Sequence, residues 1–344
     1  SNAFFGAVQI VTRTPVSRTF GGSLTGGSAR YGRGAAWYGD GAAGARPWSV
    51  LVSATGSYAD GEPLDHDDLG TERETDWDRN GSFYVRATRG RLAVLAATYG
   101  RRRGVIGGAY DSNFGDDQSW TEDSHGLLDL SYKAVDHENV GLKLRAYGDV
   151  YRFEDAYRYD PDPVFHDRAT STWGGAEGIF SWAAGPNQLV VSVEESAGRV
   201  AMDAFERRDS GTTAPDPTVP PNSVAEDVRT YDVTRATVHD ALRLGERIKL
   251  EAGVYAEYHG LYGLAAAPRA AVVAQLPASL TAKVLYGRGF RSPSIYERYY
   301  DDGDAVTGND DLRAETADVT ELALEKSLGG RSDVFLSAFH GEYR

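Results

Sequence analysis

The chain has 344 residues, with 36 basic and 50 acidic side chains and a formal net charge of -14 at pH 7. This acidic balance argues against nucleic acid as the main partner, because phosphate binding requires a basic face. The sequence contains no cysteine, which excludes disulfides, thiolate metal sites and cysteine nucleophiles.

The composition describes an aromatic-rich β protein, with 40 glycines, 20 tyrosines, 6 tryptophans and a mean hydropathy of -0.43. A transmembrane helix is excluded, because it needs roughly 18 consecutive apolar residues and the sequence has no such run. A membrane location stays open, since the strands of a membrane barrel alternate apolar and polar residues.

At the N-terminus, Ser1-Asn2-Ala3 looks like the remnant of a cleaved tag, so the fold is expected to start at Phe4. The first two strands are expected from Gly21 onward, as a hairpin around Tyr31 to Gly34. The glycines of that segment suit a tight turn.

Two longer segments alternate apolar and polar residues. Between Ile248 and His259 every second residue is apolar, a period of two that predicts a strand with one apolar and one polar face. A similar pattern runs from Val140 to Tyr151. Soluble sandwiches and propellers favour strands of about five or six residues, whereas about ten residues cross a bilayer when tilted. The lengths therefore favour membrane-spanning strands.

The connections alternate between short and long. Short turns lie near residues 89–91, 136–139, 185–187, 244–247, 276–279 and 328–331, and longer polar connections lie near 60–80, 103–120, 153–170, 203–227 and 292–316, with a shorter one near 260–267. With about fifteen strands counted from Gly21, all short turns fall on one side and all long loops on the other. That parity is typical of an antiparallel up-and-down transmembrane β-barrel. A soluble sandwich or propeller is the alternative.

Two phrases near the C-terminal end carry a family resemblance. Tyr286-Gly-Arg-Gly-Phe-Arg-Ser-Pro-Ser-Ile-Tyr-Glu297 is followed by Gly308-Asn-Asp-Asp-Leu-Arg-Ala-Glu-Thr316. In this order and spacing they resemble the middle of a TonB-dependent outer-membrane receptor barrel. That family has a strand ending in Gly-Phe-Arg-(Ala/Ser)-Pro-(Ser/Thr) and a loop closing with Gly-Asn-Pro-(Asp/Glu)-Leu-Lys-Pro-Glu. Asp310 and Ala314 stand where the family usually has prolines.

Two further segments are similar to the same family. The segment from Phe5 to Pro15 resembles the last strand of its plug domain, and the segment from Pro268 to Pro277 resembles its Pro-Arg strand. The resemblance implies a tag remnant at 1–3, the end of a plug at 4–18 and the N-terminal part of the barrel at 19–344. Such transporters have barrels of about 22 strands. About fifteen are expected in this chain, with the remaining C-terminal strands and most of the plug outside it.

The function implied by the resemblance is that of a ligand-gated receptor in the bacterial outer membrane, spanning it with many strands. It would take up a scarce nutrient complex, with an iron-siderophore as the default cargo. The implied partners are the TonB-ExbB-ExbD system acting through the missing N-terminal region, a small-molecule or metal-chelate ligand, outer-membrane lipid and the barrel assembly machinery. No cofactor, enzyme activity or nucleic-acid binding is expected. The seven histidines form no His-Glu-x-x-His motif.

Candidate ligand contacts lie on the inward polar faces and in aromatic loops. The inward faces carry Lys143, Arg145, Glu251, Tyr255 and Glu257, which would line the lumen and meet the plug. Variable loops on a rigid scaffold usually carry recognition. The predicted ligand-binding residues are Tyr157, Tyr159, Phe165, Tyr300, Arg145 and Tyr255. Ordinary lumen solvation, or an aromatic belt at the membrane surface, is the alternative role.

Acidic loop tips suggest one metal site. The segment from Asp111 to Asp117 concentrates oxygen ligands of the kind that calcium prefers. Asp111, Asp116 and Asp117 are therefore candidate ligands of a structural calcium in an external loop. Solvated acidic tips are the alternative, given the overall acidity.

Two other functions stay open. An outer-membrane adhesin or surface ligand-binding barrel would need neither plug nor TonB-contacting segment. A soluble all-β carbohydrate-binding module would not depend on detergent. The identity of the cargo is not encoded in any motif that we recognise.

Overall fold

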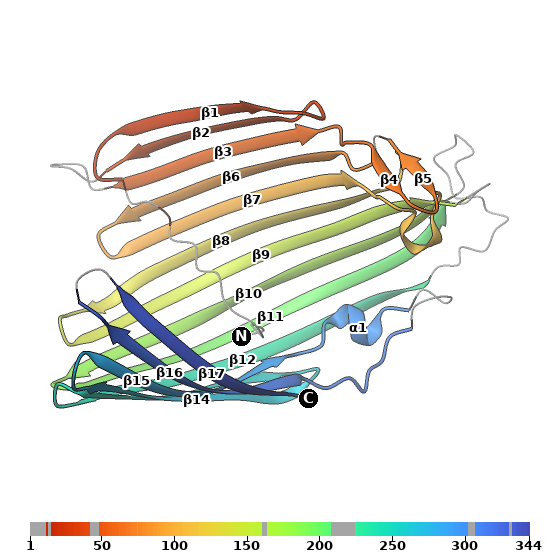
Figure 1. Cartoon of the computed structure of the whole chain (residues 1–344). Coiled ribbons are helices and arrows are strands. Elements are labelled where there is room, and N and C mark those ends of the chain that lie inside the picture. Colours follow the sequence, from red (N-terminus) through yellow and green to blue (C-terminus); the bar gives the residue numbers. More distant parts are fainter. Residues whose placement is uncertain are drawn as a thin grey trace.

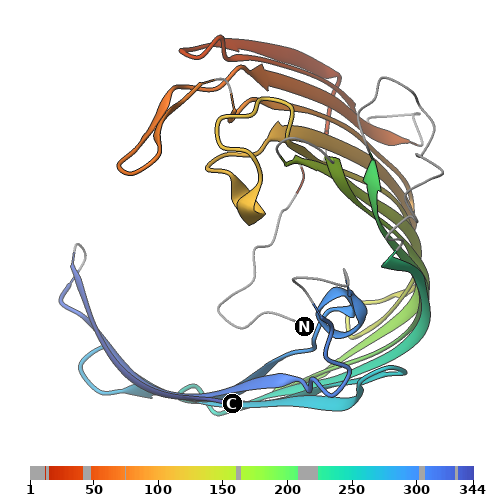
Figure 2. The same ribbon diagram turned by 90° about the vertical axis from the view of Figure 1, so that its right-hand side faces the viewer.

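The computed structural model describes residues 12, 15–41, 48–73, 75–159, 164–207, 224–301, 307–329 and 332–344. Fifteen antiparallel strands form one sheet in sequence order, and β4 and β5 form a separate two-stranded hairpin (Figure 1). The sheet curves into an open wall whose free edges are β1 and β17 (Figure 2). The predicted fold class is confirmed, with the barrel not closed within this chain. No helix of the described part is long and apolar enough to cross a membrane.

The strands become longest in the middle of the wall. Their bounds are β1 (Thr19–Gly26), β2 (Gly32–Asp40), β3 (Ser49–Ala59), β4 (Leu64–His66), β5 (Gly70–Glu72), β6 (Asp78–Arg89), β7 (Leu92–Gly104), β8 (Trp120–Asp136), β9 (Val140–Arg158), β10 (Val164–Ala184), β11 (Asn187–Arg207), β12 (Val224–Leu244), β13 (Ile248–His259), β14 (Gly263–Leu276), β15 (Leu280–Arg291), β16 (Glu315–Ser327) and β17 (Asp333–Tyr343). Two short helices, η1 (Ala109–Asp111) and α1 (Ile295–Tyr299), lie in loops.

The predicted parity of the connections holds for most of the wall, but the short turns between β1 and β2 and between β13 and β14 lie at the same end as the long loops. Tight turns such as the one between Arg89 and Leu92 lie at one end of the wall, here called the turn end. The loops that hold β4, β5, η1 and α1 lie at the opposite, loop end (Figure 1). The first hairpin is displaced from its expected position, because Gly32 already pairs with Gly26 and the turn lies before it.

Two predicted connections are also shorter than expected. Strands β9 and β10 continue to pair as far as Arg158 and Val164, and β14 already begins at Gly263. In both places the ladder of backbone hydrogen bonds continues past the end of the alternating sequence pattern. The alternating sequence pattern shows only which face of a strand is apolar. Backbone hydrogen bonds between strands form whatever the side chains are.

The two faces of the wall have opposite chemistry. On β13, the side chains of Val254 and Tyr258 point to the outside and are 40% and 52% exposed. Glu257 and His259 lie on the concave side and are only 6% and 9% exposed. A soluble protein shows the reverse, with apolar side chains covered. An apolar outer face and a polar inner face are the pattern of a barrel in a bilayer.

Aromatic residues mark the height of the apolar outer face. Trp48, directly before β3, and Tyr58, near its other end, are 38% and 53% exposed on the outer face. Ten residues of strand span about 34 Å, or about 24 Å at a 45° tilt, close to the 25 Å apolar band of membrane barrels. The pair therefore has the spacing of two interfacial aromatic belts.

The segment before β1 reaches the concave face. Thr12 accepts hydrogen bonds from the Tyr84 hydroxyl at 3.1 Å and from Arg86 at 3.0 Å. The carbonyl of Pro15 accepts one from Ser49 at 3.2 Å. Of the predicted plug remnant at 4–18, the other residues before Pro15 lie outside the described part, so the plug assignment stays a prediction.

Candidate functional site

The chain leaves β15 at Arg291 and folds back over the concave face, where it forms α1 (Figure 2). A capping box starts this helix: the Glu297 backbone N–H donates to the Ser294 hydroxyl at 3.1 Å, and the Ser294 N–H donates to the Glu297 carboxylate at 2.7 Å. The Ser294 backbone N–H, helped by Arg291, lowers the pKa of Glu297. Local sequence alone therefore suffices to begin this short helix.

The two phrases that carry the family resemblance meet in one loop. Arg291, from the first phrase, lies 2.9 Å from Glu297 and 2.9 Å from Glu315 of the second phrase. The Asn309 N–H donates to the Glu297 carbonyl at 3.1 Å, and Arg298 donates to the Leu312 carbonyl at 3.1 Å. These ion pairs and hydrogen bonds hold the start and the end of the loop together.

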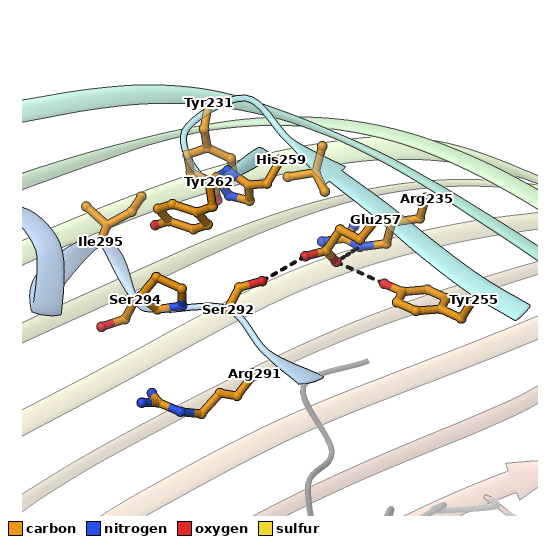
Figure 3. Close-up of a pocket in the computed structure, with 12 residues that line it drawn as sticks. Tyr231, Arg235, Tyr255, Glu257, His259, Tyr262, Arg291, Ser292, Ser294 and Ile295 are labelled. Atoms are coloured by element: carbon orange, nitrogen blue, oxygen red, sulfur yellow. Dashed lines mark hydrogen bonds and ion pairs between the residues drawn. The ribbon is translucent and has the colours of Figure 1, made fainter. Parts of the chain in front are cut away.

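A cavity of about 500 Å³ lies between this loop and the wall (Figure 3). It is lined by residues of β12 and β13, the following turn and the start of the loop: Tyr231, Val233, Arg235, Tyr255, Glu257, His259, Tyr262, Arg291, Ser292, Pro293, Ser294 and Ile295. Both polar and aromatic side chains face it, an arrangement common in small-molecule sites.

Glu257 is the focus of the cavity. Its carboxylate accepts hydrogen bonds from Arg235 at 2.9 Å, from the Tyr255 hydroxyl at 2.9 Å and from Ser292 at 3.4 Å (Figure 3). The carboxylate is thus buried but fully partnered, as a buried charge must be. The contact with Ser292 connects the loop directly to the wall.

Two separate sets of ion pairs lie on the concave face and are here together called the lumen ladder; the first contains Glu257. Arg235 also lies 2.7 Å from Glu194, which accepts the Tyr147 hydroxyl at 2.5 Å. On neighbouring strands, Arg145 contacts Asp129 and lies 3.5 Å from Glu177. The ladder thus holds four carboxylates and two guanidinium groups, a surplus of two negative charges. Its members are Asp129, Arg145, Glu177, Glu194, Arg235 and Glu257.

Stacked rings anchor α1 to β12 and β13. His259 stacks on Tyr231 at 5.2 Å and on Tyr262 at 4.0 Å between ring centroids. Arg298 of α1 lies over the Tyr262 ring at 5.1 Å, and Tyr299 lies under Arg229 at 4.3 Å. Burial raises the pKa of Tyr262 to about 12. The helix is therefore held by cation–π contacts with the wall.

The loop is anchored a second time by Tyr300. Its hydroxyl donates to Asp167 of β10 at 2.5 Å, and its ring packs against Met202 of β11. Phe165 packs against the same small core. The structure thus brings two predicted ligand residues, Tyr300 and Phe165, together, but their rings pack within the protein.

The remaining predicted ligand residues fall into two groups. Arg145 and Tyr255 lie on the concave face as expected, and Tyr255 lines the cavity. Tyr157 and Tyr159 lie elsewhere, beneath Tyr110 of η1: the Tyr157 ring meets the Tyr110 ring edge-on at 5.3 Å, and the Tyr159 hydroxyl donates to the Tyr110 carbonyl at 3.1 Å. Binding of a ligand by these six residues stays a prediction.

Two residues of this region escaped the sequence analysis. Tyr110 is 76% exposed, whereas Tyr157 beneath it is 7% exposed. Of these two rings, Tyr110 is therefore the one accessible to a ligand. Glu72 is 1% exposed and accepts hydrogen bonds from the Gly107 N–H at 2.8 Å and from His66 at 2.9 Å. It joins loop 60–77 to loop 105–119. In the sequence, the paired glycines at 107 and 108 indicated a turn at this contact, but not the role of Glu72.

The candidate calcium residues have local roles. Asp116 accepts hydrogen bonds from the Ser119 hydroxyl at 2.8 Å and from the Gln118 N–H at 3.2 Å. The Asp117 carbonyl accepts one from Trp77 at 3.2 Å. Across the part of the chain that the structure describes, no three His, Cys, Asp or Glu side chains gather as a metal site would require. Calcium binding by Asp111, Asp116 and Asp117 stays an untested prediction.

A carboxyl pair lies where β9 and β10 leave the apolar part of the wall. Asp155 is 2% exposed and accepts a hydrogen bond from the Asp167 N–H at 2.7 Å. The outward neighbours Arg152 and Glu154 are charged, so this part of β9 lies beyond the apolar run. Burial raises the pKa of Asp155 to about 7. Asp155 therefore titrates close to neutral pH beside the residue that holds Tyr300.

Comparison with known families and structures agrees with this arrangement. The family model for the TonB-dependent receptor-like β-barrel matches residues 53–344. A search of the curated proteins found no match.

Several solved structures share the fold. A point mutant of the ferric enterobactin receptor PfeA of Pseudomonas aeruginosa is 15% identical with a TM-score of 0.71, over 97% of this chain and 54% of that one. The siderophore receptor PirA of Acinetobacter baumannii is 15% identical with a TM-score of 0.68, over 96% and 53%. The copper transporter OprC is 13% identical with a TM-score of 0.67, over 96% and 54%. The chain thus spans about half the length of these proteins.

Proposed function

Because the chain belongs to the TonB-dependent receptor family through its β-barrel domain, we propose that it forms part of an outer-membrane receptor that takes up a nutrient complex with energy delivered through TonB. The turn end of the wall then faces the periplasm and the loop end faces the outside. In this arrangement the loop over the cavity lies at the external mouth of the lumen.

One observation carries the proposal: residues 292–301 are held over a polar lumen wall while the opposite face of the same strands is apolar. Ser292 reaches Glu257 of the lumen ladder at 3.4 Å, and Tyr300 reaches Asp167 at 2.5 Å. A ligand at the external loops is therefore within a few side chains of the lumen surface. Energised transport requires such a link between capture and passage.

We propose a metal chelate as the cargo, with an iron-siderophore as the first candidate. PfeA is named as a ferric enterobactin receptor, PirA as a siderophore receptor and OprC as a copper transporter, which supports a cargo containing a metal. The aromatic and cationic side chains that line the cavity, including Tyr262 and Arg291, suit a flat organic chelate that carries negative charge. Tyr110 supplies a second exposed ring at the mouth.

The test is growth of a strain that lacks the gene, on media in which ferric enterobactin, another ferric siderophore, ferric citrate or limiting copper is the sole source of its metal. We expect a defect on at least one source, and its repair by the full-length gene. Repair should fail in a strain without TonB. Unchanged growth of the deletion strain on every source contradicts uptake of a metal chelate, and repair without TonB contradicts energised transport.

A further inference from the structure

The ladder of backbone hydrogen bonds between β14 and β15 stops before the loop end. Its last pair is Arg269 with Gly287, whereas the ladders of β13 with β14 and of β15 with β16 continue to the loop end. Residues 263–268 of β14 therefore leave one edge unpaired, although the structure describes both these residues and residues 288–292 that follow Gly287. We call this unpaired edge of β14 the seam.

The ladder stops because the chain after Gly287 crosses to the concave side of β13 instead of continuing beside β14. The Phe290 side chain is 0% exposed, and its ring stacks on Tyr255 of β13 with 5.8 Å between centroids and 20° between planes. Ser292 reaches Glu257 of β13 at 3.4 Å (Figure 3). Both contacts pass over β14 and are made with the strand beyond it.

The side chains of Phe290 and Ser292 belong to the outer face of β15. Alternate residues of a strand share a face, and Val284 of the same set stands opposite Val272, where both are exposed on the outer face. Because residues 288–292 lie inside β13, this outer face here meets the concave face of β13. A return of the segment to the plane of the wall turns Phe290 and Ser292 outward without rotating the strand about its axis.

The seam offers a second pairing position for this segment. Continuation of the observed register places Ala266 opposite Phe290 and Leu264 opposite Ser292. Backbone N–H and C=O groups of the seam then gain partners, and unpaired backbone groups are costly in a bilayer. Ala266 is small enough to leave room for the phenyl ring on the outer face. Pairing with β16 uses the opposite edge of β15 and is retained in both positions.

We propose that residues 288–292 form a two-position strand that covers and uncovers the cavity. In the covered position, described here, the strand crosses β13 and carries Ser292 and Pro293 into the cavity lining. In the uncovered position it pairs with the seam, and Ser292 and Pro293 leave the cavity. The exchange replaces side-chain contacts with β13 by backbone hydrogen bonds with β14. It requires neither a particular cargo nor energised transport.

A bond at the far end of the same loop favours the covered position. The Tyr300 hydroxyl donates to Asp167 of β10 at 2.5 Å. Movement of Ser292 to the seam pulls on this bond, because the chain between Ser292 and Tyr300 is short and consists mainly of α1. Loss of the bond should therefore increase the population of the uncovered position.

The chain contains no cysteine, so an engineered disulfide can report the uncovered position. In the full-length protein with L264C and S292C, the two thiols lie on opposite faces in the covered position: Leu264 is 74% exposed on the outer face, and Ser292 meets Glu257 on the concave face. They stand opposite each other only when the strand pairs with the seam, and a disulfide needs Cα atoms within about 7 Å. Mass spectrometry of the linked peptides measures the rate of oxidation.

A270C/Y286C is the matched control, because Ala270 and Tyr286 already stand opposite each other on the outer face. The two engineered pairs are separated by an even number of residues, so they are the same kind of antiparallel pair. We expect the control to oxidise rapidly and L264C/S292C several-fold more slowly. Adding Y300F to L264C/S292C should speed its oxidation about tenfold, since a hydrogen bond to a charged group is lost, and should leave the control unchanged.

Absence of the disulfide in L264C/S292C, with and without Y300F, while the control oxidises, overturns the proposal. Oxidation as fast as in the control and independent of Y300F contradicts it as well, because the strand would then be paired with β14 throughout.

Hydroxyl-radical labelling of Tyr262, which lines the cavity, supplies a second measurement. Labelling should rise when the disulfide of L264C/S292C forms, return to its starting level on reduction, and stay constant in the control. Unchanged labelling of Tyr262 in the oxidised variant contradicts the uncovering of the cavity.

Discussion

The loop end of the wall carries two loop assemblies that are held by different means. In the first, loops 60–77 and 105–119 are joined to each other, because Glu72 of one accepts a backbone N–H of Gly107 in the other. In the second, the loop that follows β15 is joined to the wall through Tyr300 and through the contact of Ser292 with Glu257.

The difference lies in what each carboxylate holds. Glu72 is buried among backbone amides, so it fixes the position of one loop against its neighbour. Glu257 and Asp167 belong to strands, so they fix the second loop against the lumen surface. A movement of the second loop therefore changes contacts of Glu257 and Asp167, whereas a movement of the first assembly changes contacts at the loop end of β9, where the Asn113 N–H donates to the Arg158 carbonyl at 2.8 Å.

The largest expected effect separates the two assemblies. E72A removes the buried carboxylate that accepts from the Gly107 N–H and from His66, both of which are only partly buried, so we expect a loss of about 2 kcal/mol of local stability. Hydrogen exchange should rise together in loops 60–77 and 105–119 and stay unchanged in α1. E62A is the control, because Glu62 accepts only an exposed Ser28 hydroxyl at 2.7 Å in the same loop. Faster exchange in α1 would show that the assemblies are coupled.

The second prediction concerns pH and acts on the second assembly. Burial raises the pKa of Asp155 from its ordinary value of 3.8 to about 7, so the folded form holds this proton more tightly than the unfolded form. Stability therefore falls as pH rises from about 4 to about 7, the range in which the folded form alone keeps the proton. Above that range two carboxylates face each other beside Tyr300.

Hydrogen exchange of α1, corrected for the intrinsic pH dependence of amide exchange, should accordingly show weaker protection at about pH 8 than at about pH 5.5. The neutral D155N variant should lose most of this difference, because asparagine cannot ionise. The same pH dependence in wild type and D155N would assign it to another group. E72A serves as a further control, since it should leave the pH response of α1 intact.

The third prediction concerns Arg291, which joins the two recognised phrases. R291A removes ion pairs with Glu297 and Glu315, both partly exposed, so the expected loss of local stability is small. Exchange in residues 295–301 and 307–314 should increase, without change in loop 105–119. R288A on the same strand is the matched control, because Arg288 pairs with Asp318 at 2.9 Å but does not contact α1. Equal effects of the two variants would contradict the role of Arg291.

The smallest expected effect is at the start of α1. S294A removes the side-chain acceptor of the Glu297 N–H and should cost about 1 kcal/mol or less of helix stability. S294D keeps an acceptor at the same position and should behave like the wild type. Exchange at Glu297 and Arg298 reports the difference, and equal exchange in both variants would mean that the loop contacts alone hold the helix.

Much of the wall could be predicted because strands repeat with a period of two. The predicted strand from Ile248 to His259 has the observed bounds, and Arg145 and Tyr255 were correctly assigned to the inner face. The loops have no such period. Tyr157 is covered by Tyr110, whose backbone has the left-handed φ of 57°, a conformation that the sequence does not announce for a tyrosine.

The side-chain contacts of the site could not be predicted from short stretches of sequence. Tyr300 and Asp167 are 133 residues apart, and their meeting depends on the curvature of the whole wall. The phrases around Arg291 and Glu315 were recognisable because they form one continuous loop. Their recognition located the second assembly but gave no sign of the cavity beneath it.

The strand order of the wall has a consequence for how the protein is made. Every strand of the large sheet pairs only with neighbours that are adjacent in that sheet, and apart from the small β4–β5 hairpin these are also consecutive in sequence. The wall can therefore grow one hairpin at a time, with no segment threaded through another. Each new hairpin pairs with the edge strand that precedes it in sequence, so the segments that pair are always close along the chain. A defect in one hairpin therefore delays the hairpins that follow it and leaves the earlier ones paired.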